Sequence, residues 1–186
     1  MKLRRSRAAI LVPLVALALV ISACGSGESS VADVSTGARP NLPAAQAASS
    51  TDLPAVTVWN VGDSKWVQFA DLLPAEKPLV LWFWAPHCPA CAAEAPAVKK
   101  FAEDHANQLN VVGIGTQDDA TMAAQFLKKH DLGFPMLWDE GFETWKAFGV
   151  TSQPTVAVLN KDGKLLDKWS GGISESKALR TLGLKN

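Results

Sequence analysis

The sequence contains few residues that bind metal ions through sulfur or nitrogen. There are three cysteines and three histidines among 186 residues. Cys88 and Cys91 form one closely spaced pair, but no second pair of cysteines or histidines occurs at similar spacing. A structural zinc site usually takes about four such ligands. The sequence therefore predicts neither a metal site nor another cofactor.

The sequence also has no net charge, since 18 basic and 18 acidic residues balance. That balance offers no reason to expect nucleic acid as a partner. Five of the basic residues but only two of the acidic ones precede residue 51, so the remainder of the chain is mildly acidic. The basic cluster therefore belongs to the N-terminal segment.

No hydrophobic run reaches the roughly 20 residues of a comfortable membrane span. The longest one, Ala8–Ile21, follows the basic segment Met1–Arg7 and precedes Ser22 and Ala23. This order is typical of an export signal. Ile21–Cys24 resembles a bacterial lipobox, in which the cysteine becomes the lipid-carrying first residue of the mature chain. An ordinary secretory signal cut nearby and an uncleaved anchor are the alternatives.

We therefore divide the chain into three parts. Residues 1–23 are predicted to be a lipoprotein signal peptide. Residues 24–50, rich in Ala, Ser, Gly and Pro, are predicted to be a flexible tether lipidated at Cys24. Lipidation accounts for a third cysteine that would otherwise be an odd free thiol in an exported chain. Residues 51–186 are predicted to form one domain, large enough to bury a core without staples.

Apolar patterning predicts an α/β fold for this domain. The run 79–84 is typical of a strand buried on both faces, and a helix follows from Cys88 to about His105. The other expected elements are strands at 55–59, 66–69, 109–114, 134–137, 155–159 and 164–169, and helices from a cap at 118 or 119 to 130, at 140–148 and from 174 toward 184. This order predicts a central mixed β-sheet flanked by helices, with an N-terminal β-hairpin extension.

Three expectations concern packing. Trp84, the aromatic residue nearest the cysteine pair, is expected to pack under the active site, and Trp82 is not expected to share its face of the strand. Met122 is expected to point into the core. His105 and His130, near helix ends, are expected to be solvated.

The pair Cys88-Pro-Ala-Cys91 stands where the buried strand runs into a helix. Unpaired N–H groups and the positive dipole end of a helix favour a thiolate there, and the thiolate is the form that attacks a disulfide. An inert buried pair is not expected in an exported protein, where thiols oxidise. We therefore predict a redox pair, with Cys88 as the exposed nucleophile and Cys91, one turn in, as the buried resolving thiol.

The segment Phe83–Cys91 resembles the thioredoxin-fold active site of extracytoplasmic TlpA/ResA/DsbE-type thiol-disulfide oxidoreductases, and it is most similar to the exported DsbE/DsbF-like proteins of actinobacteria. The segment Gly149–Thr155 resembles the loop that holds a cis-proline opposite that site, and Asn160–Lys164 matches the hairpin that follows. The resemblance extends over 51–186 and implies a thioredoxin-like fold. It also implies that Pro154 is cis and that the Gln153 backbone can pair with an extended substrate segment.

The resemblance points to two further side chains near the cysteines. Glu94 matches a glutamate that is frequent in the family, and it lies on the same helix side as Cys91. It is the candidate to take or relay the Cys91 proton, because Trp82 stands where thioredoxins have a buried acid. His87 replaces a residue that is commonly aromatic, and an imidazolium there would favour the Cys88 thiolate. A solvated carboxylate and an exposed loop residue are the alternatives.

These features predict a thiol-disulfide oxidoreductase held by lipid at the outer face of the cytoplasmic membrane. Its expected partners are exported proteins that carry thiols or disulfides, and a membrane redox partner that recycles the cysteine pair. The resemblance slightly favours oxidation over reduction, although the direction depends on the reduction potential.

Two other functions are alternatives. A thiol peroxidase of the redoxin superfamily would need a Pro-x-x-x-Thr-x-x-Cys setting, which is absent before Cys88. A Sco-like copper-binding module would have three residues between its cysteines and a distant histidine, whereas two residues separate Cys88 and Cys91 here.

Overall fold

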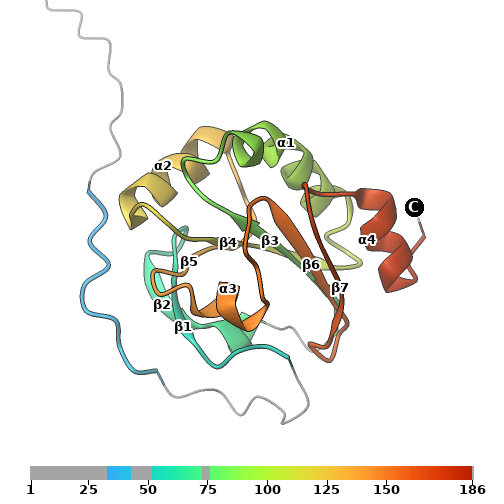
Figure 1. Ribbon diagram of the computed structural model, residues 1–186, viewed down its shortest axis with the longest axis horizontal. Helices are drawn as coiled ribbons and strands as arrows, with labels where there is room; N and C mark the ends of the chain where they lie inside the picture. The colour runs from blue at the N-terminus through green and yellow to red at the C-terminus, as the bar shows by residue number, and fades with distance from the viewer. Residues whose placement is uncertain (1–32, 43–51, 73–75, 186) are drawn as a thin grey trace, which may run out of the picture. The chain divides into compact units, whose positions relative to one another are not determined.

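The computed structural model describes residues 33–42, 52–72 and 76–185. The chain divides into two units, 1–30 and 31–186. The expected signal peptide and Cys24 lie outside the described residues, so the structure bears only on the second unit. Its centre is a seven-stranded sheet with the strand order β2-β1-β5-β4-β3-β6-β7 (Figure 1).

The elements follow the expected order with shifts of one to three residues at most boundaries. The strands are β1 (Thr57–Asn60), β2 (Lys65–Gln68), β3 (Leu79–Trp84), β4 (Asn110–Gly115), β5 (Met136–Trp138), β6 (Thr155–Leu159) and β7 (Leu165–Ser170). The helices are α1 (Pro89–Asp104), α2 (Ala120–His130), α3 (Glu143–Ala147) and α4 (Glu175–Leu182), with a 3-10 turn at Phe69–Leu72.

Strand β3 lies inside the sheet between a parallel and an antiparallel neighbour. It pairs parallel with β4, which pairs parallel with β5, and antiparallel with β6. The β1–β2 hairpin joins the sheet through antiparallel pairing of β1 with β5, and β7 pairs antiparallel with β6 at the other end. The predicted mixed sheet and its N-terminal hairpin extension are therefore confirmed.

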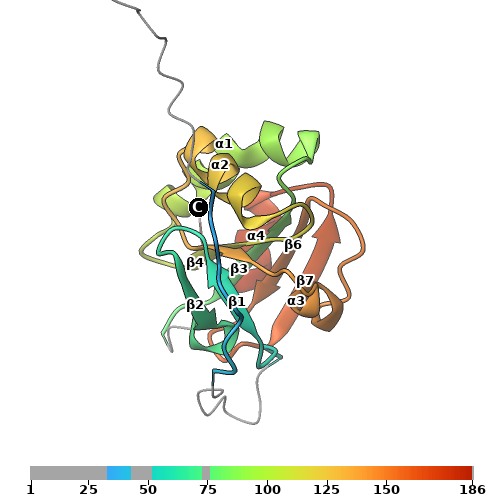
Figure 2. The same ribbon diagram turned by 90° about the vertical axis from the view of Figure 1, so that its left-hand side faces the viewer.

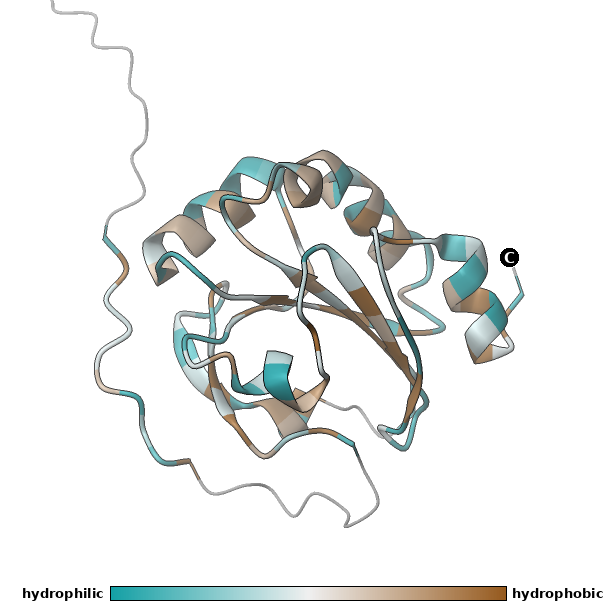
Figure 3. Ribbon diagram, in the orientation of Figure 1, coloured by the Kyte–Doolittle hydropathy of each residue, from teal (hydrophilic) through white to brown (hydrophobic). Residues whose placement is uncertain are grey.

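Two hydrophobic cores lie on opposite faces of the sheet. Helices α1 and α2 cover one face and α3 lies on the other (Figure 1). The first core includes Trp82, Trp84 and Val98, and the second includes Phe83 and Trp145. The central strands include the most hydrophobic residues of the domain, whereas α4 includes many hydrophilic ones (Figure 3).

The expectation that Trp82 and Trp84 occupy different faces is wrong. Side chains two residues apart in a strand point to the same side, and these two indoles stack with ring centroids 6.0 Å apart. Trp84 also stacks on Phe126 of α2, at 4.5 Å. The glycine at position 115 makes room, because a Cβ there would meet the Trp84 ring at 2.6 Å.

Two other packing expectations are also wrong. Met122 stands in the first turn of α2 and is 39% exposed, whereas Phe126, one turn on, is buried. His105 is buried at the end of α1, with its Nε2 2.8 Å from Oε1 of Glu175. That contact joins the C-terminal end of α1 to the first turn of α4. Burial lowers the pKa of His130, which is partly covered by Phe126.

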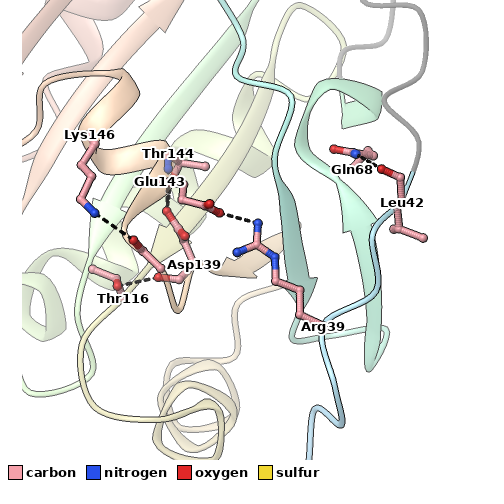
Figure 4. Close-up of polar contacts among 9 residues, drawn as sticks. Arg39, Leu42, Gln68, Thr116, Asp139, Glu143, Thr144 and Lys146 are labelled. Atoms are coloured by element: carbon pink, nitrogen blue, oxygen red, sulfur yellow. Dashed lines mark hydrogen bonds and ion pairs between the residues drawn. The ribbon is translucent and has the colours of Figure 1, made fainter.

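Residues 33–42, which we call the N-terminal strap, run along the β1–β2 side of the domain (Figure 2). Four polar contacts hold the strap: Val34 N to Thr121 Oγ1 (2.9 Å), Trp66 Nε1 to Thr36 O (2.8 Å), Gln68 Nε2 to Leu42 O (2.6 Å), and an Arg39–Glu143 ion pair (Figure 4). The strap falls within 24–50, which we predicted to be a tether. At least this part of it docks on the domain.

A buried carboxylate stabilises the end of the sheet where the parallel strands β4 and β5 reach their C-terminal residues. The Asp139 carboxylate accepts hydrogen bonds from the Thr144 backbone N–H (2.7 Å) and hydroxyl, and Thr116 Oγ1 donates to the Asp139 carbonyl oxygen at 2.6 Å (Figure 4). These bonds tie the start of α3 to the strand ends. Strand β3 is parallel to β4, so its C-terminal residue and the cysteine pair that follows lie at the same end of the sheet.

Candidate active site

The cysteine pair begins α1 directly after β3. Cys88 has an extended backbone and caps the helix, because its Sγ accepts a hydrogen bond from the Cys91 backbone N–H at 3.0 Å. Pro89 occupies the first helical position, where a missing N–H costs nothing. The local sequence thus places a sulfur atom at the positive end of a helix of 16 residues, as the strand–helix junction predicted.

Cys88 and Cys91 are joined by a disulfide, with their Cα atoms 5.2 Å apart. Cys91 is completely buried, whereas Cys88 keeps 6% of its surface exposed. The next two residues, Pro89 and Ala90, are exposed. An incoming thiolate therefore reaches Cys88 first. The burial of Cys91 agrees with the sequence prediction, whereas the expectation that Cys88 is exposed is wrong, because Cys88 too is buried apart from that small fraction.

Pro154 directly precedes β6, the antiparallel neighbour of β3. The Gln153–Pro154 bond is cis, as the family resemblance implied. The antiparallel register pairs Thr155 of β6 with Phe83 of β3, which brings the preceding loop next to the end of β3. Pro154 has no backbone N–H, and its carbonyl oxygen accepts a hydrogen bond from Gly171 N at 3.0 Å.

Glu94 stands one turn after Cys91 on α1 and is half-buried. Its Oε1 accepts a hydrogen bond from Trp82 Nε1 of β3, and its Oε2 accepts one from the Ile173 backbone N–H at 3.3 Å. Burial raises the pKa of Glu94, and the two hydrogen bonds counteract part of that rise. The alternative of a fully solvated helix carboxylate is therefore wrong.

His87 lies on the exposed side of the cysteine turn. Its Nδ1 is 2.6 Å from Oδ2 of Asp118, in the loop between β4 and α2, and its side chain is 45% exposed. Gln117 and Asp118 both have positive φ values, 66° and 61°. That conformation is uncommon for residues other than glycine, and such residues tend to gather at functional sites.

Asp118 is a site residue that sequence reasoning missed. It was considered only as a helix cap, and the structure gives that role to Asp119, whose carboxylate accepts the Met122 N–H at 2.8 Å. Thirty-one positions separate His87 from Asp118, so no local spacing indicates their contact. The parallel pairing of β3 with β4 brings the two loops together.

Trp84 is the last residue of β3 and is fully buried, in the same hydrophobic core as Cys88 and Cys91. Among the described residues, no group of three or more His, Cys, Asp or Glu side chains is arranged to hold a metal ion. The helices of the described part include none that is long and apolar enough to cross a membrane.

A mixed sheet with a disulfide at the start of the helix after an internal strand, and a cis-proline beside it, defines a thioredoxin-fold protein. The chain belongs to the Redoxin family, whose model matches residues 48–182. The strap therefore precedes the matched region.

Two curated relatives carry names that bear on the chemistry. The "Soluble secreted antigen MPT53" of Mycobacterium tuberculosis is 38% identical over 87 residues, which are 47% of this chain and 50% of that protein. The "Thiol-disulfide oxidoreductase ResA" of Halalkalibacterium halodurans is 26% identical over 100 residues, 53% of this chain and 57% of that protein. The chain thus spans about half the length of the curated relatives it matches.

Two solved structures extend the likeness over more of the domain. MTB DsbF, in its mixed oxidized and reduced forms, is 33% identical with a TM-score of 0.61, covering 70% of this chain and 93% of that one. The pneumococcal exposed lipoprotein thioredoxin Etrx1 of Streptococcus pneumoniae is 27% identical with a TM-score of 0.59, covering 69% and 97%. Both likenesses support the thioredoxin-like fold.

Proposed function

We propose that this protein is a thiol-disulfide oxidoreductase that exchanges disulfides with other proteins through Cys88 and Cys91. The observation that carries the proposal is the disulfide at the start of α1, of which Cys88 alone keeps exposed surface. The name of the relative ResA and the structural likeness to DsbF support the same activity.

The exchange proceeds through a mixed disulfide. In the reducing direction the Cys88 thiolate attacks one sulfur of a partner disulfide, and the other partner sulfur leaves as a thiolate. Cys91 then loses its proton and attacks Cys88 Sγ, which releases the second partner sulfur. Two electrons pass to the partner, whose thiolates take up two protons, and the Cys88–Cys91 disulfide forms. The oxidising direction is the reverse.

Side chains around the pair assist these steps. Glu94 accepts the Cys91 proton in the reducing direction and returns it in the oxidising one. Burial raises its pKa, which makes the Glu94 carboxylate a better proton acceptor than a solvated glutamate. An imidazolium at His87 would favour the Cys88 thiolate, and the contact with Asp118 holds the imidazole ring in place. The Gln153 backbone pairs with an extended segment of the substrate.

The protein acts outside the cytoplasm, held by a lipid at Cys24 on the outer face of the cytoplasmic membrane. The order of the basic, apolar and small residues before Cys24 supports this location. A secreted relative, MPT53, and an exposed lipoprotein neighbour, Etrx1, are consistent with export. Its partners are exported proteins with thiols or disulfides, and a membrane protein that recycles the pair.

The reduction potential of the Cys88–Cys91 pair tests the direction. The protein is equilibrated in glutathione buffers of defined ratio, and the fraction of disulfide is measured after acid quenching and alkylation. We favour an oxidase, for which a value near about −120 mV is expected, whereas a value near about −270 mV would indicate a reductase. Consumption of hydrogen peroxide without exchange activity would instead support the peroxidase alternative.

A further inference from the structure

The Glu94 carboxylate, carried by α1, is hydrogen-bonded by two other segments of the chain. These are β3, which contributes Trp82, and the turn Gly171–Ile173 between β7 and α4. Each oxygen of the carboxylate meets one N–H donor, from the Trp82 indole and from the Ile173 backbone. A carboxylate that merely faced solvent would not need two donors from distant parts of the chain.

We propose that Trp82 is a positioning residue of the exchange reaction, whose indole N–H holds the Glu94 carboxylate beside Cys91 and stabilises its ionised form. This inference deepens the proposed function and rests on it. Thioredoxins place a buried acid at the position of Trp82. Here the acid stands on the helix, and the strand supplies a hydrogen-bond donor to it.

The indole of Trp82 cannot easily turn away from Glu94. Trp82 is fully buried, stacks on Trp84 and lies 6.3 Å from the ring of Phe126. A buried N–H that loses its acceptor costs free energy, so the packed indole favours one place for the carboxylate. The rigid strand thus determines where the proton acceptor lies relative to the helix that carries Cys91.

The turn on the other side of Glu94 is shaped for close approach. A Cβ at Gly172 would lie 1.9 Å from Glu94 Oε2, and the residue has a positive φ of 97°, so glycine is required there on both counts. The Gly172 carbonyl oxygen accepts the Trp169 indole N–H at 2.8 Å, and Gly171 N donates to Pro154 O at 3.0 Å. The same turn therefore contacts both Glu94 and the cis-proline.

The charged side chains on the surrounding elements have other partners. Lys177 of α4 pairs with Asp167 of β7 and lies over the Trp169 ring, and Glu175 contacts His105. Lys168 of β7 donates to two carbonyl oxygens, and Lys99 of α1 pairs with Asp131. Cys91, one turn before Glu94 on α1, is the titratable group on the same side of the helix. The protonation of Glu94 is thus governed by burial and by its two donors, Trp82 and Ile173.

The test is the pH dependence of mixed-disulfide resolution in Trp82→Phe. Burial raises the pKa of Glu94 and the indole lowers it. Removal of the donor should therefore raise that pKa, and the base form should appear only at higher pH. We expect the midpoint of the rate–pH profile to move upward by about one unit, measured by rapid mixing of the reduced protein with a disulfide-bonded peptide. An unchanged midpoint would overturn the proposal.

Two controls separate the hydrogen bond from loss of indole volume. Trp145→Phe removes a buried indole from the opposite core, and its Nε1 has no hydrogen-bond partner among the described residues. It should leave the midpoint unchanged. In a Glu94→Gln background, Trp82→Phe should produce no further shift, because the coupling needs the carboxylate. An equal shift in that background would assign the effect to general packing and overturn the proposal.

A second measurement needs no change at Trp82. The indole ¹H–¹⁵N resonance of Trp82 should titrate with Glu94 in the wild-type protein, and the titration should vanish in Glu94→Gln. A resonance that does not respond to pH overturns the inference, even if Trp82→Phe fails to fold. If the wild-type protein shows no disulfide exchange at all, the proposed function is refuted. Failure of the proposed function can therefore be distinguished from failure of the inference about Trp82.

Discussion

Two carboxylates flank the cysteine pair in contrasting surroundings. Asp118 contacts His87 on the exposed side, through two loops and in reach of solvent. Glu94 contacts Trp82 on the covered side, between a helix and a strand. Water and salt screen the first pair, whereas the second lies where charge interacts strongly with its surroundings. We therefore expect the exposed pair to adjust the attack of Cys88, and the covered one to control the resolution by Cys91.

The largest effect is expected from substitution of the cysteines, because the two sides of the site are assigned to attack by Cys88 and resolution by Cys91. Cys91→Ser should accumulate a stable mixed disulfide with a disulfide-bearing substrate, and turnover should be abolished, because no second sulfur of the protein can resolve the adduct. Cys88→Ser should form no adduct at all, since Cys91 is fully buried. Non-reducing gels and mass spectrometry of the trapped species measure both. Adducts on Cys91 in Cys88→Ser would reverse the two assignments.

The next effect is expected from Glu94→Gln. The amide keeps the size of the side chain but cannot take a proton, so resolution of the mixed disulfide at neutral pH should slow by about 100-fold, at the low end of general acid–base effects. Formation of the mixed disulfide by Cys88 should change little. Stopped-flow tryptophan fluorescence can follow the two steps separately. Equal slowing of both steps would show that Glu94 stabilises the structure of the turn with Cys88 and Cys91, and that it is not a proton acceptor for Cys91.

The residues of the covered side were accessible to sequence reasoning only in part. The apolar run 79–84 indicated the buried strand, and the family resemblance pointed to Glu94 and to the cis bond before Pro154. The hydrogen bond between Trp82 and Glu94 depends on which strand face the helix covers. We assigned that face wrongly for Trp82, although the rule that residues two apart share a face was sufficient to place it with Trp84.

The exposed side was less accessible, because it depends on contacts between loops. Asp118 reaches His87 only through parallel pairing of β3 with β4 and two residues of left-handed backbone. Neither feature has a local signature such as glycine at those positions. The strap is a similar case, since a segment of low hydrophobicity indicated a tether, yet its contacts use backbone groups and Arg39.

A smaller effect is expected from Asp118→Asn. Loss of the carboxylate removes the contact that joins the His87 ring to the loop after β4. The rate at which iodoacetamide alkylates reduced Cys88 at neutral pH should fall by less than about fivefold, because an exposed ion pair contributes about 1 kcal/mol or less. The difference from the wild type should shrink in high salt. If His87→Trp leaves the alkylation rate unchanged, His87 does not influence Cys88.

The smallest effect is expected from Arg39→Ala in the strap, which provides a reference for the exposed side. The Arg39–Glu143 pair is about as exposed as the His87–Asp118 pair, with side chains 34% and 42% exposed, but it joins the strap to the start of α3. Its loss should lower the melting temperature by about 4 °C or less, and disulfide exchange should be unchanged. Glu143→Gln removes the other charge of the pair and should lower the melting temperature by a similar amount. The double variant should lower it little further. A lower exchange rate at an unchanged melting temperature would mean that the strap acts on the cysteine pair. That result would contradict the view that only the residues around His87 and Glu94 influence the cysteines.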